Sequence, residues 1–246
     1  MNTSSNGYVM GFAIGICVVI SAMLAVTANF LKPTQDAAAE FDRQKNVMMA
    51  AGLVAADDQR SRTALEKLYR DRVEELVVDT ETGSVAAGKT VADVGAMKSP
   101  ADKRRYRVVA ISKAADGAPE SYVVPISGKG LWSTIYGYLA LERDLVHVRG
   151  VTFYKHGETP GLGGECENPV WCAQWKGKSI LDEQGKLVGV IVKKTKIDPS
   201  IPAEKAHKVD GLSGSTITSN GITRFVKADL TAFEKYLASL RTQQNK

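Results

Sequence analysis

An uninterrupted apolar stretch opens the chain. From Tyr8 to Ala28 the residues are apolar or small, apart from two with hydroxyl groups, and the first 31 positions contain no Asp, Glu, Lys or Arg. A helix of this length spans ~31 Å, which matches the hydrocarbon core of a membrane. The pattern predicts a membrane anchor over residues 1–31. A cleaved signal peptide is the alternative, because Val26 and Ala28 are small residues suited to a peptidase.

The flanks of the apolar stretch bear on its orientation and its neighbours. No Lys or Arg precedes it, whereas Lys32, Arg43 and Lys45 follow it. The positive-inside bias alone would keep the following domain in the cytoplasm, although this bias is weak for a long domain. The spacing of Gly11 and Gly15 creates a small-residue face against which another helix can pack.

Two helical patterns follow the anchor, and together they make residues 32–100 a helical entry region. The segment from Thr34 to Val54 has the composition of a helix, with Pro33 just ahead of it and Gly52 near its end. A second pattern places apolar residues on one helical face before a Thr-Gly turn signal. These residues are Leu65, Leu68, Tyr69, Val73, Leu76 and Val77.

The texture of the chain then changes to β-branched and aromatic runs separated by Gly, Pro, Asp or Ser, which predicts strands. The four runs are Arg105–Ile111, Tyr122–Ile126, Thr134–Glu142 and Val146–Tyr154. The segment Ser179–Lys193 has a glycine-containing turn at 183–186 between apolar runs, which predicts a hairpin.

The last apolar positions recur at helical spacing and predict a long amphipathic helix packed on the core. They are Ile222, Phe225, Val226, Leu230, Phe233, Tyr236, Leu237 and Leu240. The fold class is therefore α+β: one N-terminal transmembrane helix, then a single domain with a mainly antiparallel sheet flanked by helices. We expect its main body over residues 101–246.

Composition narrows the possible functions. The chain has 246 residues, 44% of them hydrophobic and 24% charged, which suits one globular domain with an appendage. The net charge of +5 comes from alternating basic and acidic residues, so nucleic acid is not expected as a partner. Three histidines lack the spacing of a ligand set, and no metal site is predicted. Cys166 and Cys172 are candidates either for a disulfide or for buried thiols.

Glycine and hydroxyl residues concentrate in two segments, 154–165 and 210–221. The second runs directly into the C-terminal helix, and a helix N-terminus with free amides favours an anion such as a phosphate. The simpler interpretation is an Asn or Ser cap with a flexible approach. A Walker motif is excluded because no Lys-Ser or Lys-Thr pair follows the glycines.

The second segment contains Asp210-x-x-Ser213-Gly214-Ser215-Thr216. It resembles the D-x-x-[S/T]-G-[A/S]-T motif, at which a flavin transferase esterifies FMN through its phosphate to the last threonine. This motif defines the FMN-binding domain family shared by the C subunit of the Na⁺-translocating NADH:quinone reductase and the G subunit of the Rnf complex. The chain departs from the commoner pattern at Ser215, where alanine is more frequent.

The resemblance covers nearly the whole chain. It includes Arg43-Gln44-Lys45-Asn46, Gly130-Leu131-Trp132-Ser133 and the run from His156 to Gly163. The first two segments favour the NADH:quinone reductase branch over the Rnf branch. The resemblance implies covalent FMN on Thr216 and an FMN pocket lined by Leu131, Trp132, Ser133, Thr134, Glu158, Thr159, Gly161, Leu162 and Gly163.

Two further features follow if FMN is attached at Thr216. The helix start, together with Lys208, Arg224 or Lys227, is expected to stabilise the phosphodiester. We also expect Gly161 and Gly163 to let the backbone approach the flavin ring.

By resemblance, the function is a membrane-anchored electron relay inside a complex that oxidises NADH, reduces ubiquinone and exports Na⁺. Sister subunits A, B, D, E and F are the implied partners, and a flavin transferase is implied for maturation. The resemblance places the soluble domain in the periplasm, behind a single-pass anchor in the bacterial inner membrane. The alternatives are an Rnf-type electron-transport subunit and a membrane-anchored sensory or scaffold module that binds flavin.

Overall fold

The structure is a computed structural model that describes residues 6–244, and it divides into two compact units that meet between Arg43 and Gln44. Helix α1 (Asn6–Ala50) begins in the first unit and ends in the second. Its apolar part is long enough to cross a membrane. The two helical segments predicted on either side of Pro33 form this one helix, since an internal proline removes only one backbone hydrogen bond.

The end of α1 follows the predicted glycine signal. Gly52 has a φ of +71°, and the Leu53 amide donates to the Met48 carbonyl at 2.9 Å. A left-handed residue just past a helix satisfies its last carbonyls in this way, and glycine adopts the conformation without strain. The helix therefore ends at Ala50 rather than at Val54.

Helix α2 (Arg62–Arg72) is capped by Ser61, whose hydroxyl accepts from the Ala64 amide. Strand β1 (Val73–Asp79) follows directly, so the helix predicted through Val77 is wrong beyond Arg72. The run Val73-Glu-Glu-Leu-Val-Val fits either period, and the backbone donors and acceptors of a neighbouring strand decide for β. This pairing brings part of the entry region into the main sheet.

Six antiparallel strands form that sheet, in the order β2-β1-β3-β4-β5-β6. The four predicted strands are confirmed within a few residues. The remaining bounds are β2 (Ser84–Val85), β3 (Tyr106–Lys113), β4 (Pro119–Lys129), β5 (Thr134–Glu142) and β6 (Val148–Lys155). Two short helices, α3 (Val91–Ala96) and α4 (Pro100–Arg105), lie between β2 and β3.

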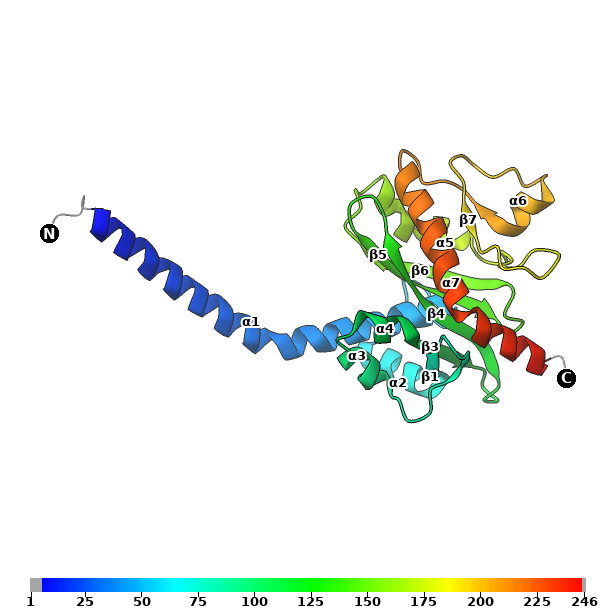
Figure 1. Cartoon of the computed structure of the whole chain (residues 1–246), viewed down its shortest axis with the longest axis horizontal. Helices are drawn as coiled ribbons and strands as arrows, with labels where there is room; N and C mark the ends of the chain where they lie inside the picture. The colour runs from blue at the N-terminus through cyan, green and yellow to red at the C-terminus, as the bar shows by residue number, and fades with distance from the viewer. Residues whose placement is uncertain (1–5, 245–246) are drawn as a thin grey trace. The chain divides into compact units, whose positions relative to one another are not determined.

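The C-terminal helix α7 (Thr216–Gln244) lies across the sheet and contacts β4 most extensively (Figure 1). Its predicted apolar stripe is confirmed: Ile222, Phe225, Val226, Leu230, Phe233, Tyr236 and Leu237 are buried. Gly128 of β4 leaves room for Phe225, because a Cβ at this position would overlap the Phe225 side chain. The close approach fixes α7 on the sheet.

Short elements fill the chain between β6 and α7. They are η1 (Gly163–Glu167), α5 (Pro169–Ala173), β7 (Ile191–Val192), α6 (Pro202–His207) and β8 (Lys208–Val209). The predicted turn at 183–186 is confirmed, since Leu181 and Leu187 form an antiparallel bridge across it. The predicted hairpin ends there, because β7 pairs in parallel with β8 instead. The observed architecture is the predicted α+β class.

Candidate functional site

Thr216, the threonine predicted to carry FMN, lies at the very start of α7. Thr216 is exposed and is the first residue of the helix, whereas Ser215 before it is buried. Gly214 has a φ of +68°, which turns the chain into the helix, and the Ser219 amide donates to the Ser215 carbonyl at 3.0 Å. The Thr216 side chain therefore stands at the surface beside a helix N-terminus.

Residues 210–216, which end in the predicted FMN acceptor, are called the acceptor segment. Asp210, the first residue of the motif, holds this segment against α5. Its carboxylate accepts from the Ile197 amide at 2.7 Å and from the Gln174 side chain at 3.2 Å. Its backbone amide donates to Gln174, and its carbonyl accepts from the Trp171 indole at 2.9 Å. Asp210 thus holds the approach to Thr216 in place with contacts that Asn or Ala would not reproduce fully.

The two glycine-rich segments singled out in the sequence meet in the structure. The Thr218 hydroxyl donates to Glu158 Oε2 at 2.6 Å, in a buried contact. Leu162 lies against Gly214, where an added Cβ would be 2.8 Å from Leu162 Cδ2. The loop around Glu158 and the acceptor segment therefore form one site.

The loop before β5 joins the same site through its backbone. Glu158 accepts hydrogen bonds from the amides of Leu131 (3.1 Å), Trp132 (2.9 Å) and Ser133 (3.1 Å). Burial acts to raise the pKa of Glu158, but the hydrogen bonds from Thr218 and these three amides outweigh it and lower the pKa. The carboxylate is therefore anionic at neutral pH.

Exposed apolar side chains gather on the segments that Glu158 and Thr218 connect. The exposed fractions are 40% for Leu131, 67% for Trp132, 42% for Leu162 and 56% for Ile217. These side chains lie on segments that contact the one carrying the exposed Thr216, and an aromatic with three aliphatic side chains suits a planar aromatic group tethered there. The residues present therefore fit a flavin attached to Thr216.

Glycine is required at the two predicted pocket positions, Gly161 and Gly163, for different structural reasons. Gly161 has a φ of +74° and open space where a Cβ would lie, so its backbone conformation demands glycine. Gly163 is buried, and a Cβ there would lie 2.9 Å from Thr218 Oγ1 and 3.0 Å from Glu158 Oε2. The carbonyl of Thr159 accepts from the amides of Leu162 and Gly164 and shapes the turn. Packing within the protein accounts for the second glycine.

The basic residues expected to stabilise the phosphodiester differ in whether the protein already binds them. Lys208 donates to Glu204 at 3.2 Å, and Lys193 donates to the same carboxylate at 2.7 Å. Hydrogen bonds from the Asp198 amide and from these lysines lower the pKa of Glu204 to about 2. Lys208 is therefore engaged inside the protein. Arg224 and Lys227 are exposed farther along α7.

The cysteines and histidines do not build a second reactive centre. Cys166 and Cys172 are free thiols, and Cys172 Sγ donates to the Cys166 carbonyl at 3.3 Å. Burial raises the pKa of both thiols to about 12. His156 pairs with Glu167 at 3.2 Å. Within residues 6–244, no group of three His, Cys, Asp or Glu side chains is arranged to hold a metal ion.

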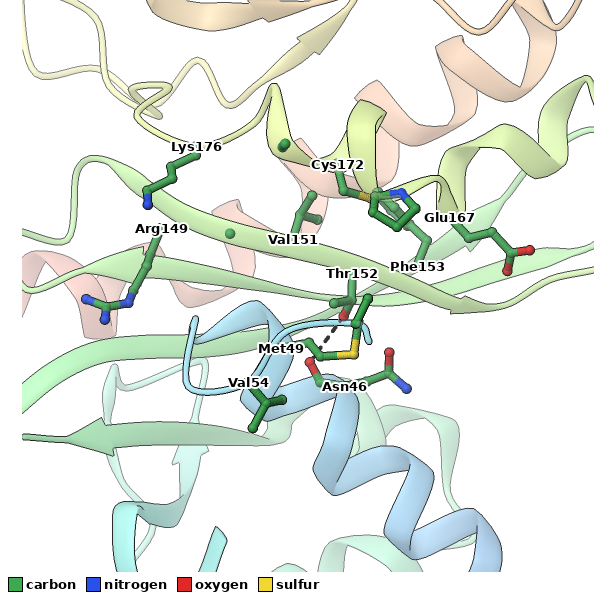
Figure 2. A pocket seen from close by; sticks show the side chains of 14 residues that line it. Asn46, Met49, Val54, Arg149, Val151, Thr152, Phe153, Glu167, Cys172 and Lys176 are labelled. Atoms are coloured by element: carbon green, nitrogen blue, oxygen red, sulfur yellow. Dashed lines mark hydrogen bonds between the residues drawn. The ribbon is translucent and has the colours of Figure 1, made fainter. Parts of the chain in front are cut away.

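A separate pocket lies between the end of α1, strand β6 and helix α5 (Figure 2). Thr152 donates to the Asn46 carbonyl at 3.3 Å across it, and Met49 faces it from α1. The Arg149 guanidinium at its edge is already bound by Glu120 and Glu142. The lining contains none of the acceptor-motif residues.

Three residues of the site escape the sequence patterns. Thr218 and Gln174 act through side-chain hydrogen bonds, and Ile217 presents an exposed apolar group beside Thr216. Ile217 is an apolar residue within a polar run, and this was the available signal. The partners of Thr218 and Gln174 are 60 and 36 residues distant in the chain, so no local pattern identifies them.

Known proteins resemble this chain over most of its length. Residues 130–231 match the family model of the FMN-binding domain. The chain is 36% identical to the C subunit of the Na(+)-translocating NADH-quinone reductase of Pseudomonas aeruginosa, over 98% of each chain. It is 34% identical to the protein of the same name from Yersinia pestis, over 90% of this chain and 87% of that one.

Solved structures agree with this result. The crystal structure of NqrC from Shewanella oneidensis matches with a TM-score of 0.70 and 31% identity, and covers 83% of this chain and 99% of that one. The corresponding reductase subunit from Parabacteroides distasonis matches with a TM-score of 0.69 and 28% identity, over 84% and 96% of the two chains. The chain therefore belongs to the family of the C subunits of Na⁺-translocating NADH-quinone reductases.

Proposed function

We propose that this chain is a membrane-anchored flavoprotein subunit that relays electrons within a Na⁺-translocating NADH-quinone reductase, where NADH oxidation and ubiquinone reduction drive Na⁺ export. The observation that carries the proposal is the exposed Thr216 at the start of α7, next in sequence to the exposed Ile217. Its segment contacts the loops that carry the exposed side chains of Leu131, Trp132 and Leu162. Family membership supports the same activity. FMN supplies one- and two-electron chemistry that no side chain of the protein offers.

We further propose that FMN is joined to Thr216 by a phosphoester formed by a flavin transferase. The hydroxyl is accessible, and the segment from Asp210 through Ser213, Gly214 and Ser215 presents it on a fixed turn. The free amides of the first turn of α7 favour the charge of the phosphodiester, and Arg224 and Lys227 add positive charge along the helix. The tether prevents loss of the cofactor without bond breakage.

The residues that face the flavin follow from this arrangement. Leu131, Trp132 and Leu162 would cover the apolar part of the ring. The turn from Thr159 through Gly161 would form one edge of the pocket, with Ser133 and Thr134 on the neighbouring loop, where Ser133 accepts from the Gly157 amide. Glu158 sits behind these loops and holds them together.

The proposed location is the bacterial inner membrane, with the domain in the periplasm behind an uncleaved anchor and subunits A, B, D, E and F as partners. The apolar part of α1 and the family support it. We expect protease added to intact spheroplasts to degrade the domain, and detection of the N-terminal segment in the purified protein by mass spectrometry. A domain protected from the protease, or a mature N-terminus at Asn29, would contradict one half of this proposal.

The attachment site is tested by expressing the full chain with a flavin transferase. The peptide containing Thr216 should gain the mass of FMN less one water, and Thr216→Ala should abolish flavin fluorescence in a denaturing gel. Thr231→Ala is the matched control, because Thr231 is exposed on the same helix and bonds only to the Lys227 carbonyl. Flavin found on another residue, or flavin that denaturation releases, would contradict the proposed attachment to Thr216.

A further inference from the structure

The carboxylate of Glu158 is buried, and every one of its acceptor positions is occupied by a donor from the protein. Only 5% of the residue is exposed, and both of its oxygens are fully used by the protein. Oε1 accepts from the Trp132 and Ser133 amides, and Oε2 accepts from the Leu131 amide and the Thr218 hydroxyl. A carboxylate with two donors on each oxygen has no acceptor position left to offer a cofactor. Glu158 therefore does not bind the flavin directly.

The donors around Glu158 are dipoles rather than cations. No lysine, arginine or histidine side chain within residues 6–244 forms an ion pair with it. Three amides and one hydroxyl stabilise the charge without neutralising it, so a negative charge remains in the interior of the site. Gly130 and Gly163 close around the carboxylate, since a Cβ at either position would lie within 3.0 Å of one of its oxygens.

The hydrogen bonds of Glu158 also cross between segments distant in sequence. Leu131 to Ser133 precede β5, whereas Thr218 lies in the first turn of α7, two residues after Thr216. The contact between Thr218 and Glu158 is buried and short, at 2.6 Å. The carboxylate of Glu158 thus sets the position of the first turn of α7 relative to the loop that carries Trp132.

We propose that Glu158 and Thr218 are positioning residues with an electrostatic effect: together they orient Thr216 against the Leu131–Ser133 loop, and the uncompensated charge of Glu158 holds the flavin midpoint potential low. The inference rests on the proposed attachment of FMN to Thr216. Reduction adds electrons to the flavin, and a fixed buried anion nearby makes this less favourable. The same charge in water would be screened.

The test uses two substitutions in the full chain, each with a matched control. Glu158→Gln removes the charge and retains the size of the side chain, and Glu167→Gln removes a nearby exposed charge. Thr218→Val removes the hydroxyl at similar volume, and Thr218→Ser retains it. Hydrogen exchange of the Leu131–Ser133 amides is measured without flavin, and the midpoint potential is measured after flavin attachment.

We expect the amides in Glu158→Gln to exchange about tenfold faster or more, because a hydrogen bond to a charged group is lost. Its flavin potential shifts to a more positive value, while Glu167→Gln leaves both properties unchanged. Thr218→Val also exchanges faster than Thr218→Ser. As the pH is lowered, the potential of Thr218→Val becomes more positive than that of Thr218→Ser, because the carboxylate has lost a donor and is more readily protonated.

The outcomes separate this inference from the proposed function. Wild-type exchange in Glu158→Gln, or a folded, flavin-loaded Glu158→Gln with unchanged potential, overturns it. If Glu158→Gln does not fold, Thr218→Val decides by the same two measurements, and wild-type values in both overturn the inference. A wild-type chain without flavin on Thr216 contradicts the proposed function and, with it, the effect on the flavin potential. The positioning role of Glu158 and Thr218 is then still decided by the exchange measurement, which needs no flavin.

Discussion

The two long helices of this chain, α1 and α7, differ in where their apolar side chains lie and in how far these side chains are exposed. The apolar part of α1 carries hydrophobic side chains on all sides, and these are exposed: 62% of Val18 and 60% of Phe12 remain accessible within the chain. α7 concentrates its apolar residues on one stripe, and the sheet buries them. The distribution of apolar residues around a helix, rather than their number, tells which solvent it needs.

The same contrast occurs within α1 itself. Val47, Met48 and Ala50, near its end, are buried in the second unit, whereas the side chains before them are exposed or half-buried. The apolar first part is long enough to cross a membrane, and the last turn is part of the folded domain. α1 therefore has exposed apolar side chains along its first part and, like α7, buried ones at its end.

The largest expected effect comes from the buried stripe of α7. Phe233→Ala should lower the free energy of unfolding by about 3–5 kcal/mol, because it removes a fully buried ring and leaves a cavity. Urea unfolding of the full chain in detergent measures it. Val18→Ala in α1 is the control and should leave domain unfolding unchanged. Equal effects of the two substitutions would remove the distinction between the helices.

A charge placed in the anchor tests the other side of the comparison. Val18 lies at the middle of the apolar stretch, and Val18→Arg should make membrane insertion less favourable by about 3 kcal/mol. The fraction of protein that stays in the membrane pellet after an alkaline wash reports this loss, with Val18→Leu as control. An unchanged fraction would show that this segment is not the anchor.

Helical glycines give a smaller and sharper contrast. Gly221 of α7 lies against the Lys129 carbonyl of β4, so a Cβ there would overlap backbone, whereas Gly15 of α1 has nothing within 4 Å. Gly221→Ala should cost about 1–3 kcal/mol of stability, despite the better helix propensity of alanine. Gly15→Ala should leave thermal unfolding of the domain unchanged. A stabilised Gly221→Ala would show that α7 is not held this closely.

The smallest expected effect concerns Glu204, a charged residue of α6 that lies outside α1 and α7. It shows how much a single ion-paired carboxylate contributes to stability without apolar burial. The pKa of Glu204 is lowered to about 2 by its backbone and lysine donors. A lowered folded-state pKa contributes stability above the unfolded pKa of about 4.3, and this contribution is lost as the pH falls toward 2. Glu204→Gln should therefore lower the melting temperature at pH 7 and differ less from wild type in acid. A difference that is constant with pH would contradict this origin.

Sequence patterns predict the fold where local signals and tertiary environment agree. The strands from Tyr106 to Lys155 follow from β-branched and aromatic runs bounded by turn residues, and the stripe of α7 follows from helical spacing, because these local signals match the buried environment. The pattern from Val73 to Val77 predicts a helix wrongly, because the segment satisfies both periods and only pairing with β3 selects the strand. Pro33 has the signal of a helix start, although the helix continues through it.

The amino-acid sequence by itself determined the apolar stretch, most of the strands, the apolar stripe of α7 and the motif from Asp210 to Thr216, because each of these depends on residues close together in the chain. Only the tertiary structure decided that Thr218 meets Glu158 and that Asp210 meets Gln174. It also decided which glycine is required by φ and which by packing. These properties depend on contacts between residues tens of positions apart, and such contacts exist only after the chain has closed its loops.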